Sequence, residues 1–505
     1  MNKIKKDIAF VVWLGFMFFI IGCAHKMANY AYVSQTPQDI YEIGHISIKD
    51  IQKGKWTLEQ LRLAGERLFV AQFTKDRGMG RPGATGNPNP TRRPLGTEVP
   101  FTRTAGPDAN SCFSCHHSPS VGGAGDFTSN VFTGLGSRQP IMFSTASDFS
   151  AERGTPEING AGLIELLARE MTADLHHIKK EVKEKALSTG QNIRRELITK
   201  GVSFGYLTAE PDGTLRLHEV EGIDRDLVVR PWGQKGTVTS LRTFTVNAEN
   251  LHHGLQAEER FGYHLTGSMD FDRDKVRNEL TEGDITALIV FQVGLNTPGI
   301  VLPADKKARE KVNRGKVIFN NSKCASCHIP QLKLNNPVFA EPGPYNLEGT
   351  LRNHEIKSPL LIDLTKDIDR PRLTETKEGY YMVRAFTDLK RHKISDPERP
   401  HFGNEVLVEG FTATNEFLTK RLWAVGNTAP YGHRGDLTTL REAIEHHGGE
   451  ARASRIEFEK MTYEDQEAII AFLESLQILP PNTRKGIVYQ EKTKKLPYQE
   501  TTQNE

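Results

Sequence analysis

Net charge, long apolar runs and cysteine, three features that often indicate a class of function, are scarce in this chain of 505 residues. Net charge is almost absent, because 65 basic residues oppose 63 acidic ones, and a formal charge of +2 gives no field that would favour nucleic acid as a partner. The apolar run at residues 8–21 is, at about 15 residues, short for a bilayer span. Cysteine is rare, with 5 in the whole chain. The 37% hydrophobic content still suffices for a sizeable core and excludes a disordered or fibrous protein.

The N-terminal segment is typical of an exported lipoprotein. Three lysines within the first six residues precede the apolar run, which suits the core of a signal peptide. The run ends in residues 20–23 (IIGC), which resemble a bacterial lipobox, where the cysteine is acylated and becomes the mature N-terminus. We therefore expect residues 1–22 to be a lipoprotein signal peptide and Cys23 to anchor a periplasm-facing bacterial lipoprotein to a membrane. The alternative, an unprocessed anchor helix, also tethers the chain to a membrane.

The other four cysteines fall in two Cys-x-x-Cys-His motifs. The first motif is residues 112–116 (CFSCH) and the second motif is residues 324–328 (CASCH). Two cysteines at this spacing form thioethers to the vinyl groups of one porphyrin, while the adjacent histidine reaches the iron. One such motif alone can also be a redox dithiol or half of a zinc site, but two copies in an exported chain favour two separate covalent haem c groups. The predicted attachment and iron-ligating residues are Cys112, Cys115, His116, Cys324, Cys327 and His328.

A repeated segment precedes each motif. Residues 56–73 have apolar positions at helical spacing, and their segment GERLF at 65–69 recurs as GKVIF at 315–319. Four residues separate the second copy from its motif, whereas a Gly- and Pro-rich loop at 78–96 follows the first copy. A short helix followed by the motif is typical of a cytochrome c fold. We therefore predict a mainly α fold with two cytochrome c-like haem domains, the first enlarged by loops and a small β-hairpin.

Turn signals and hydrophobic periodicity divide the rest of the chain. The predicted units are an N-terminal linker (23–64), a first haem domain (65–300), a second haem domain (301–480) and a polar, disordered tail (481–505). Helices are predicted at 164–187, 191–200, 238–256 and 282–295, a hairpin at 202–220, and a closing helix from Thr462.

The second haem has a candidate for its other axial ligand. Leu440, Ala443 and Ile444 form an apolar stripe on a predicted helix, and His447 falls within that stripe while His446 points away from it. We predict His447 as the second ligand. The alternative is a hydrogen-bonded core histidine.

The first haem has no equally clear partner. His117 directly follows the proximal histidine and can hardly reach the opposite face of the porphyrin. His252 and His253 either supply this ligand or form a polar surface pair. An open sixth position admits a small ligand, so chemistry is expected at the first haem.

A segment near the C-terminus resembles a known protein family. Residues 428–435 (TAPYGHRG), 439–444 (TLREAI) and 446–451 (HHGGEA) resemble the bacterial di-haem cytochrome c peroxidase and MauG superfamily, most closely its longer di-haem oxidoreductase branch. The resemblance covers residues 65–479. Relatives commonly carry methionine at the position of His447, so a histidine there implies a bis-histidine centre of lower potential.

The resemblance also implies roles for three residues outside the motifs. Thr428 and Pro430 match positions whose carbonyls hold an inter-domain calcium ion, which implies a calcium site. Trp232 stands in a run that resembles the family's Trp-Asp-Gly, and it would lie between the haems and carry electrons. The alternative is a core tryptophan.

Around the first haem the chain departs from the peroxidase pattern. Residues 240–244 (SLRTF) resemble a family segment and place Phe244 where peroxidases have a distal glutamine. The catalytic glutamate of the family matches Glu258 or Glu259 only with a shift, and both are otherwise solvated helix charges. A further resemblance at residues 160–165 implies that Glu165 or its apolar neighbours contribute to the distal pocket.

Together these features predict a peroxidase-like di-haem c-type oxidoreductase. It would reduce hydrogen peroxide at the N-terminal haem, with electrons relayed through the C-terminal haem from an electron-donor protein or the quinone pool, and with Glu258 or Glu259 moving protons. The first alternative is a non-catalytic, membrane-anchored electron-transfer cytochrome. The second is an O₂-dependent di-haem oxygenase, because relatives with an apolar distal pocket and a phenylalanine near the iron cleave polyisoprene.

Overall fold

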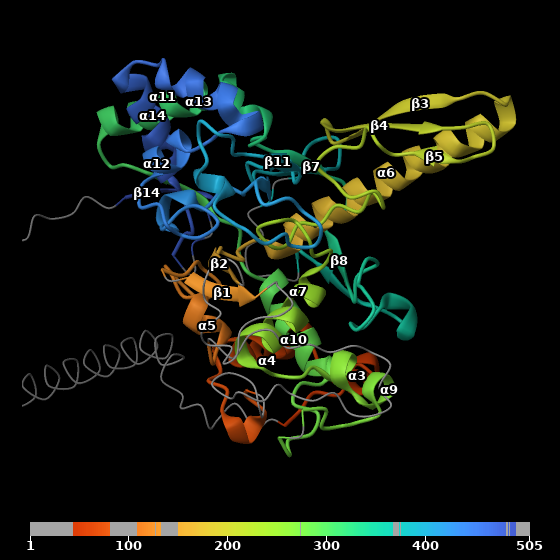
Figure 1. The fold of residues 1–505 in the computed structure, drawn as a ribbon. Helices are drawn as coiled ribbons and strands as arrows, with labels where there is room; N and C mark the ends of the chain where they lie inside the picture. Colours follow the sequence, from red (N-terminus) through yellow and green to blue (C-terminus); the bar gives the residue numbers. More distant parts are fainter. Residues whose placement is uncertain are drawn as a thin grey trace, which may run out of the picture. The chain divides into compact units, whose positions relative to one another are not determined.

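Helices form most of the regular structure (Figure 1). The computed structural model describes residues 44–80, 109–126, 128–132, 150–272, 274–366, 373, 375–480, 483 and 485–490. It is 38% helical and 17% strand, so the fold is mixed: helices predominate as predicted, but several small sheets stand where one hairpin was expected. All elements below belong to one unit that begins at Ile46.

The described helices have between 4 and 29 residues. They are α3 (Ile48–Gln52), α4 (Leu58–Val70), α5 (Cys112–Cys115), α6 (Ala161–Thr189), α7 (Leu241–Ala248), α8 (Glu258–Phe261), α9 (Tyr263–Thr266), α10 (Glu282–Val293), α11 (Lys306–Asn321), α12 (Leu440–Glu445), α13 (Arg452–Glu459) and α14 (Tyr463–Glu474). Single turns are η2 (Lys75–Arg77), η4 (Glu249–His253), η5 (Lys323–Ser326), η6 (Asn353–Glu355), η7 (His401–Gly403), η8 (Val425–Asn427) and η9 (Gly449–Ala451).

The strands form small separate sheets. Antiparallel pairs are β1 (Thr128–Phe132) with β2 (Ser150–Gly154), β7 (Leu332–Leu334) with β10 (Tyr381–Val383), β8 (Val338–Glu341) with β9 (Leu360–Asp363), and β11 (Arg391–Lys393) with β12 (Glu416–Leu418). Strand β4 (Val202–Ala209) lies between β3 (Ile193–Thr199) and β5 (Leu215–Arg216), and β6 (Gly299–Leu302) between β13 (Leu476–Gln477) and β14 (Ile487–Tyr489).

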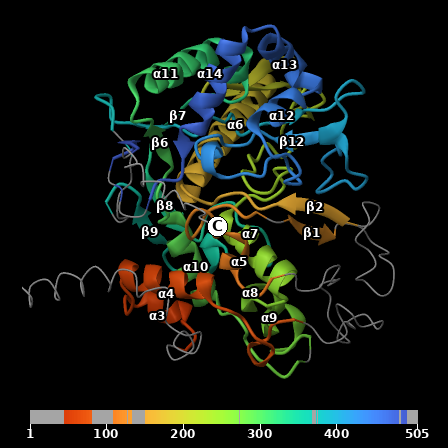
Figure 2. The ribbon, with the colours of Figure 1, turned by 90° about the vertical axis from the view of Figure 1, so that its left-hand side faces the viewer.

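Two helix pairs repeat the same contact. Helix α4 packs on α10, and α11 packs on α14, and both pairs lie side by side in the two ribbon views (Figures 1 and 2). A Cβ atom at Gly65 in α4 would lie 1.9 Å from the carbonyl oxygen of Ala287 in α10. A Cβ atom at Gly315 in α11 would lie 1.8 Å from the carbonyl oxygen of Ala468 in α14. Only glycine permits this approach, so the repeated segment specifies the same helix contact twice.

One predicted helix is wrong. Of the helix predicted at 191–200, residues 193–199 form strand β3, which pairs antiparallel with β4 and lies along α6 (Figure 1). Leu197 and Thr199 are buried while Ile198 between them is exposed, which is strand alternation. Pairing with β4 outweighs the helical spacing of the sequence. The hairpin predicted at 202–220 is present as β4 and β5.

The C-terminal part of the chain adds a strand to the described structure, whereas residues 1–43 lie outside the described ranges. The signal peptide, Cys23 and most of the loop predicted at 78–96 lie outside the described residues. In the predicted tail, Ile487–Tyr489 pairs in parallel with β6, which corrects the expectation of disorder for these residues. Within the described ranges, no helix has both the length and the apolar character needed to cross a membrane.

A buried arginine ties α7 to three other elements. Arg242 is fully buried and donates to Oε2 of Glu259 in α8 (2.9 Å) and to Oε1 of Glu341 in β8 (2.6 Å). It also donates to Oγ1 of Thr286 (3.0 Å) and to the carbonyl of Glu282 (2.9 Å), both in α10. Burial opposes the charge, but the two carboxylates outweigh it and hold the pKa of Arg242 above its usual value.

Replacing Arg242 with methionine should lower the free energy of unfolding by about 3–5 kcal/mol, because two buried carboxylates lose their common partner. Urea denaturation followed by circular dichroism measures the loss. The matched control is Arg194→Met, whose bidentate ion pair with Glu219 (2.9 Å) is exposed and should contribute about 1 kcal/mol at most. Equal losses in the two variants would contradict the role assigned to Arg242.

Candidate functional site

Each motif lies on the wall of its own cavity. The first cavity has a volume of about 390 Å³ and is lined by both cysteines and the histidine of the first motif. The second cavity, of about 260 Å³, is lined by the same three residues of the second motif. The phenylalanine of each repeated segment also lines its cavity, Phe69 the first and Phe319 the second. The repeat therefore links a helix contact to a cavity wall in both halves of the chain.

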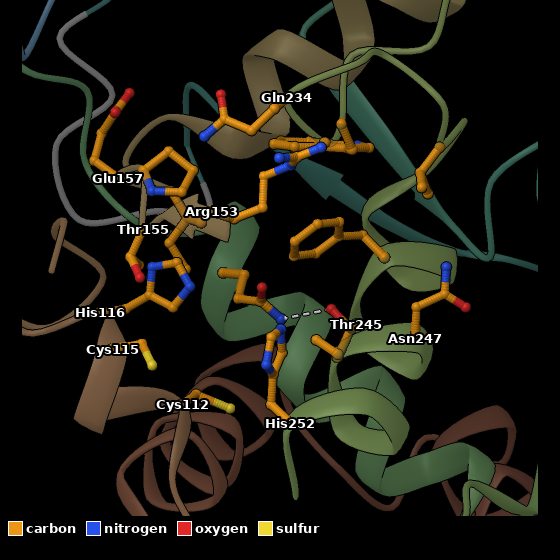
Figure 3. A pocket seen from close by; sticks show the side chains of 18 of the residues that line it. Cys112, Cys115, His116, Arg153, Thr155, Glu157, Gln234, Thr245, Asn247 and His252 are labelled. Atoms are coloured by element: carbon orange, nitrogen blue, oxygen red, sulfur yellow. Dashed lines mark hydrogen bonds between the residues drawn. The ribbon is translucent and has the colours of Figure 1, made fainter. Parts of the chain in front are cut away.

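The turn that carries the first motif is short and capped. Ser111 caps α5 through its hydroxyl oxygen, and His116 directly follows this helix. His116 Nδ1 lies 3.2 Å from the carbonyl oxygen of Gly123, so Nδ1 carries the proton and Nε2 keeps its lone pair. Figure 3 shows Cys112, Cys115 and His116 together on one side of the cavity.

Burial keeps both motif histidines uncharged. It lowers the pKa of His116 to about 4, and the pKa of His328 also to about 4. His328 Nδ1 faces the carbonyl oxygens of Phe386 (3.2 Å) and Lys420 (3.1 Å). A neutral imidazole whose Nδ1–H is hydrogen-bonded is the form that binds a metal through Nε2.

The structure brings His447 into the cavity of the second motif. One residue, His446, separates His447 from the end of α12. His447 lines the second cavity together with His328. Its Nδ1 donates to the carbonyl of Ala443 (2.7 Å), which leaves Nε2 available. His446 instead stacks on His401, with ring centroids 4.3 Å apart. The helical stripe thus located both histidines correctly, while the ligand role of His447 stays a prediction.

An irregular turn forms another part of the first cavity. Helix α7 continues into η4, a π-helical turn, and such turns occur often at functional sites. His252 lines the cavity and lies close enough to His116 to lower the pKa of His116 further. His253 lines it too, with Nδ1 2.9 Å from the carbonyl oxygen of Ala109. In Figure 3 the rings of His116 and His252 both extend into the cavity.

The aromatic residues predicted near the first haem line the first cavity. Trp232 and Phe244 are both in its wall, with ring centroids 6.5 Å apart. Glu165 is not among the lining residues, which corrects its predicted place in the distal pocket. It lies behind Trp232, where it accepts hydrogen bonds from Trp232 Nε1 (3.3 Å) and from the N–H of Leu241 (2.6 Å), and it pairs with Arg169. Glu165 therefore orients Trp232 and the start of α7.

The predicted acid–base residues Glu258 and Glu259 are also corrected. Neither lines the first cavity. Both belong to α8, and Glu259 is buried against Arg242 and accepts a hydrogen bond from the N–H of Leu351. Glu259 thus pairs with Arg242 and fixes α7 in place. Glu258 is the first residue of the same four-residue helix.

Sequence reasoning missed an acidic residue of the first cavity, Glu249. It lines the cavity, is 1% exposed, and its Oε1 lies 3.6 Å from Cys112 Sγ. Its Oε2 has no hydrogen-bond partner in the described part of the chain. Burial raises the pKa of Glu249 to about 8, although a hydrogen bond from Cys112 opposes the rise. The available signal was its spacing of four residues from His253 within a predicted helix.

One wall is common to both cavities. This shared wall consists of residues 154–157, residues 418–421 and Gln234. Trp232 lines only the first cavity, and the guanidinium group of Arg421 lies 5.7 Å from the centre of its ring. The structure therefore places Trp232 beside the shared wall rather than within it.

Thr428 and Pro430, the residues of the predicted calcium site, line the second cavity. Thr428 Oγ1 donates to the carbonyl of Ala424 (3.0 Å), which fixes its side chain within the same turn. Calcium binding by their carbonyls stays a prediction.

Two comparisons with known proteins bear on these residues. The family model described as "Di-haem oxidoreductase, putative peroxidase" matches residues 374–476, which include His447 and part of the shared wall. Cytochrome-c peroxidase IdrP2 of Denitromonas iodatirespirans is 26% identical over 223 residues. That match covers 42% of this chain and 52% of the relative, so the chain spans about half the length of the curated relative that it matches.

A solved structure was also found to be similar. Hydrazine synthase of Kuenenia stuttgartiensis, pressurised with xenon, matches with a TM-score of 0.33 and 13% identity, over 83% of this chain and 93% of that chain.

Proposed function

We propose that this chain, which belongs to the bacterial di-haem cytochrome c peroxidase superfamily, reduces hydrogen peroxide at the first cavity with electrons that enter by way of the second. Haem is the cofactor of this superfamily. The proposal rests on a difference between the residues that line the two cavities. The first adds the buried acid Glu249 to its motif, whereas the second pairs His328 with His447.

The residues around both cavities fit a covalently attached haem. Each cavity presents two cysteines that form no disulfide and a neutral histidine, and the remaining lining is largely apolar. The cysteines of each motif would hold one haem c, with His116 and His328 as iron ligands. When bound, haem supplies an iron that takes up and passes on single electrons.

The second cavity suits electron transfer rather than catalysis. His328 and His447 both hydrogen-bond through Nδ1 to backbone carbonyls, so both keep Nε2 available on the same cavity. If both histidines ligated the haem iron, no position would remain there for peroxide. The second site would therefore receive electrons from a donor protein or the quinone pool.

The first cavity holds the group needed for proton transfer. Reduction of hydrogen peroxide to two waters consumes two electrons and two protons. Because its pKa is about 8, Glu249 is protonated at neutral pH and can donate a proton from within the cavity. Phe244 and Trp232 provide apolar wall beside it. Attachment of haem to Cys112 would remove the S–H donor that opposes the raised pKa of Glu249.

The proposal includes export and a membrane tether. The signal-peptide pattern of residues 1–22 and the lipobox at Cys23 support a periplasm-facing lipoprotein. A calcium ion bound by the carbonyls of Thr428 and Pro430 would brace the second cavity, which both residues line.

Electron carriage without catalysis is a second candidate, favoured by His252. A histidine in the first cavity close to His116 would close that site as His447 closes the second. The three experiments that follow test attachment, closure and proton transfer in turn.

Replacing Cys112 and Cys115 together with alanine should reduce the haem that survives acid–acetone extraction to roughly half, because only the second motif still forms thioethers. Haem staining of the denatured chain provides the measurement. Ser114→Ala, a change inside the same motif, should retain the full amount. Full covalent haem in the double variant would disprove attachment at the first motif.

Replacing His252 with alanine should open the first site. The oxidised variant should gain a high-spin signal in its visible and electron-paramagnetic spectra, and the reduced variant should bind carbon monoxide more readily than the wild type. His264→Ala is the control, because this histidine is exposed and does not line the first cavity. A wild-type first site that is already high-spin would show that His252 is not a ligand.

Replacing Glu249 with glutamine should lower peroxide turnover at pH 7 by about 100-fold, the usual size of a lost general acid. Its raised pKa means that the acid is protonated below pH 8, so wild-type turnover should fall as the pH rises through about 8. This fall should be missing in the variant. Glu259→Gln should reduce stability without abolishing this pH dependence, and unchanged turnover in Glu249→Gln would exclude the acid.

A further inference from the structure

The shared wall contains one lysine, Lys420, that forms no direct ion pair with any described carboxylate. Lys420 lines both cavities and is exposed, so its side chain is open to the cavity space. The described residues place no carboxylate within ion-pair distance of its ammonium group. Its backbone carbonyl, in contrast, is engaged by His328 Nδ1 (3.1 Å).

The neighbouring cations all have anionic partners. Arg421 donates to Glu157 Oε1 (3.1 Å), and Trp423 Nε1 donates to the same oxygen (3.1 Å). Arg153 pairs with Glu405 and with Glu409 (2.9 Å). The carboxylates around the shared wall are therefore committed, and Lys420 adds positive charge to a confined space. A confined charge without a partner is unfavourable, and an entering anion relieves that cost.

The position of the motif cysteines indicates which anion would lie beside Lys420. Thioethers form at the vinyl edge of a porphyrin, and the two propionate carboxylates leave from the opposite edge. None of the four motif cysteines belongs to the shared wall. If each haem were held at its vinyl edge by its own motif, its propionates would lie away from the motif cysteines, in the part of the cavity that includes the shared wall.

We propose that Lys420 binds propionate carboxylates of both haems and thereby couples the two redox centres, an assignment that rests on the proposed di-haem function. The ammonium group offsets the carboxylate charge beside each iron. Reduction adds one negative charge to a site, so a cation shared by both sites favours reduction of both.

The test is a spectroelectrochemical titration of the full haem-loaded chain. Lys420→Met should shift the one-electron reduction equilibrium of both haems toward the oxidised form by about tenfold, which is 59 mV for each. Lys420→Arg keeps the charge and should stay near the wild type. Lys390→Met is the control, because Lys390 belongs to neither cavity and donates to the carbonyl of Ser203 (2.9 Å). Haem lost from Lys420→Met but retained in Lys420→Arg would also support the assignment.

Unchanged potentials, or a shift at one haem alone, would overturn shared binding by Lys420. The outcome is separable from the proposed activity. A wild-type chain with two haems but no peroxide turnover would disprove the peroxidase function while the potentials still decide the role of Lys420. A wild-type chain without two haems would overturn both.

Discussion

The close approach of two helices at a glycine is the contact on which both cavities depend. Gly65 and Gly315 each meet a backbone carbonyl of the facing helix, at distances that leave no room for a Cβ atom. One helical turn later, Phe69 and Phe319 line the two cavities. A larger residue at either glycine would separate the helices and displace the phenylalanine with them, because side chains in close-packed interiors cannot absorb such a shift. The repeated segment thus both sets the distance between the two helices and places a phenylalanine in the cavity wall.

The two halves differ in what they add to this common frame. In the first half, Arg242 holds α7 through buried carboxylates, and the π-helical end of α7 delivers Glu249 and His252 to the cavity. In the second half, the regular helix α12 leads directly to His447. The regular helix fixes the position of one histidine, whereas the irregular turn places an acid and a histidine within four residues of chain. Chemical function is therefore expected where the backbone is irregular.

The sequence predicted those features that depend on local spacing. The motifs, the amphipathic helices and the position of His447 relative to His446 follow from residues a few positions apart, and the structure places them accordingly. It could not predict β3, because pairing with β4 decides that strand. Nor could it separate Glu259 from Glu249, since both are acidic residues in helical segments. Only the partners distinguish them: Arg242 faces Glu259, and the cavity faces Glu249.

The shared wall makes the two sites interdependent although their motifs lie far apart in the sequence. Residues 154–157 precede the predicted domain boundary at 300, yet they line the second cavity, and residues 418–421 follow it, yet they line the first. Neither half alone therefore completes either cavity. Two adjacent residues also span the distance between the sites. The carbonyl of Lys420 faces the motif histidine His328, and the side chain of Arg421 lies over Trp232 in the first cavity. A change of position at His328 can thus reach the wall of the first cavity through these two residues.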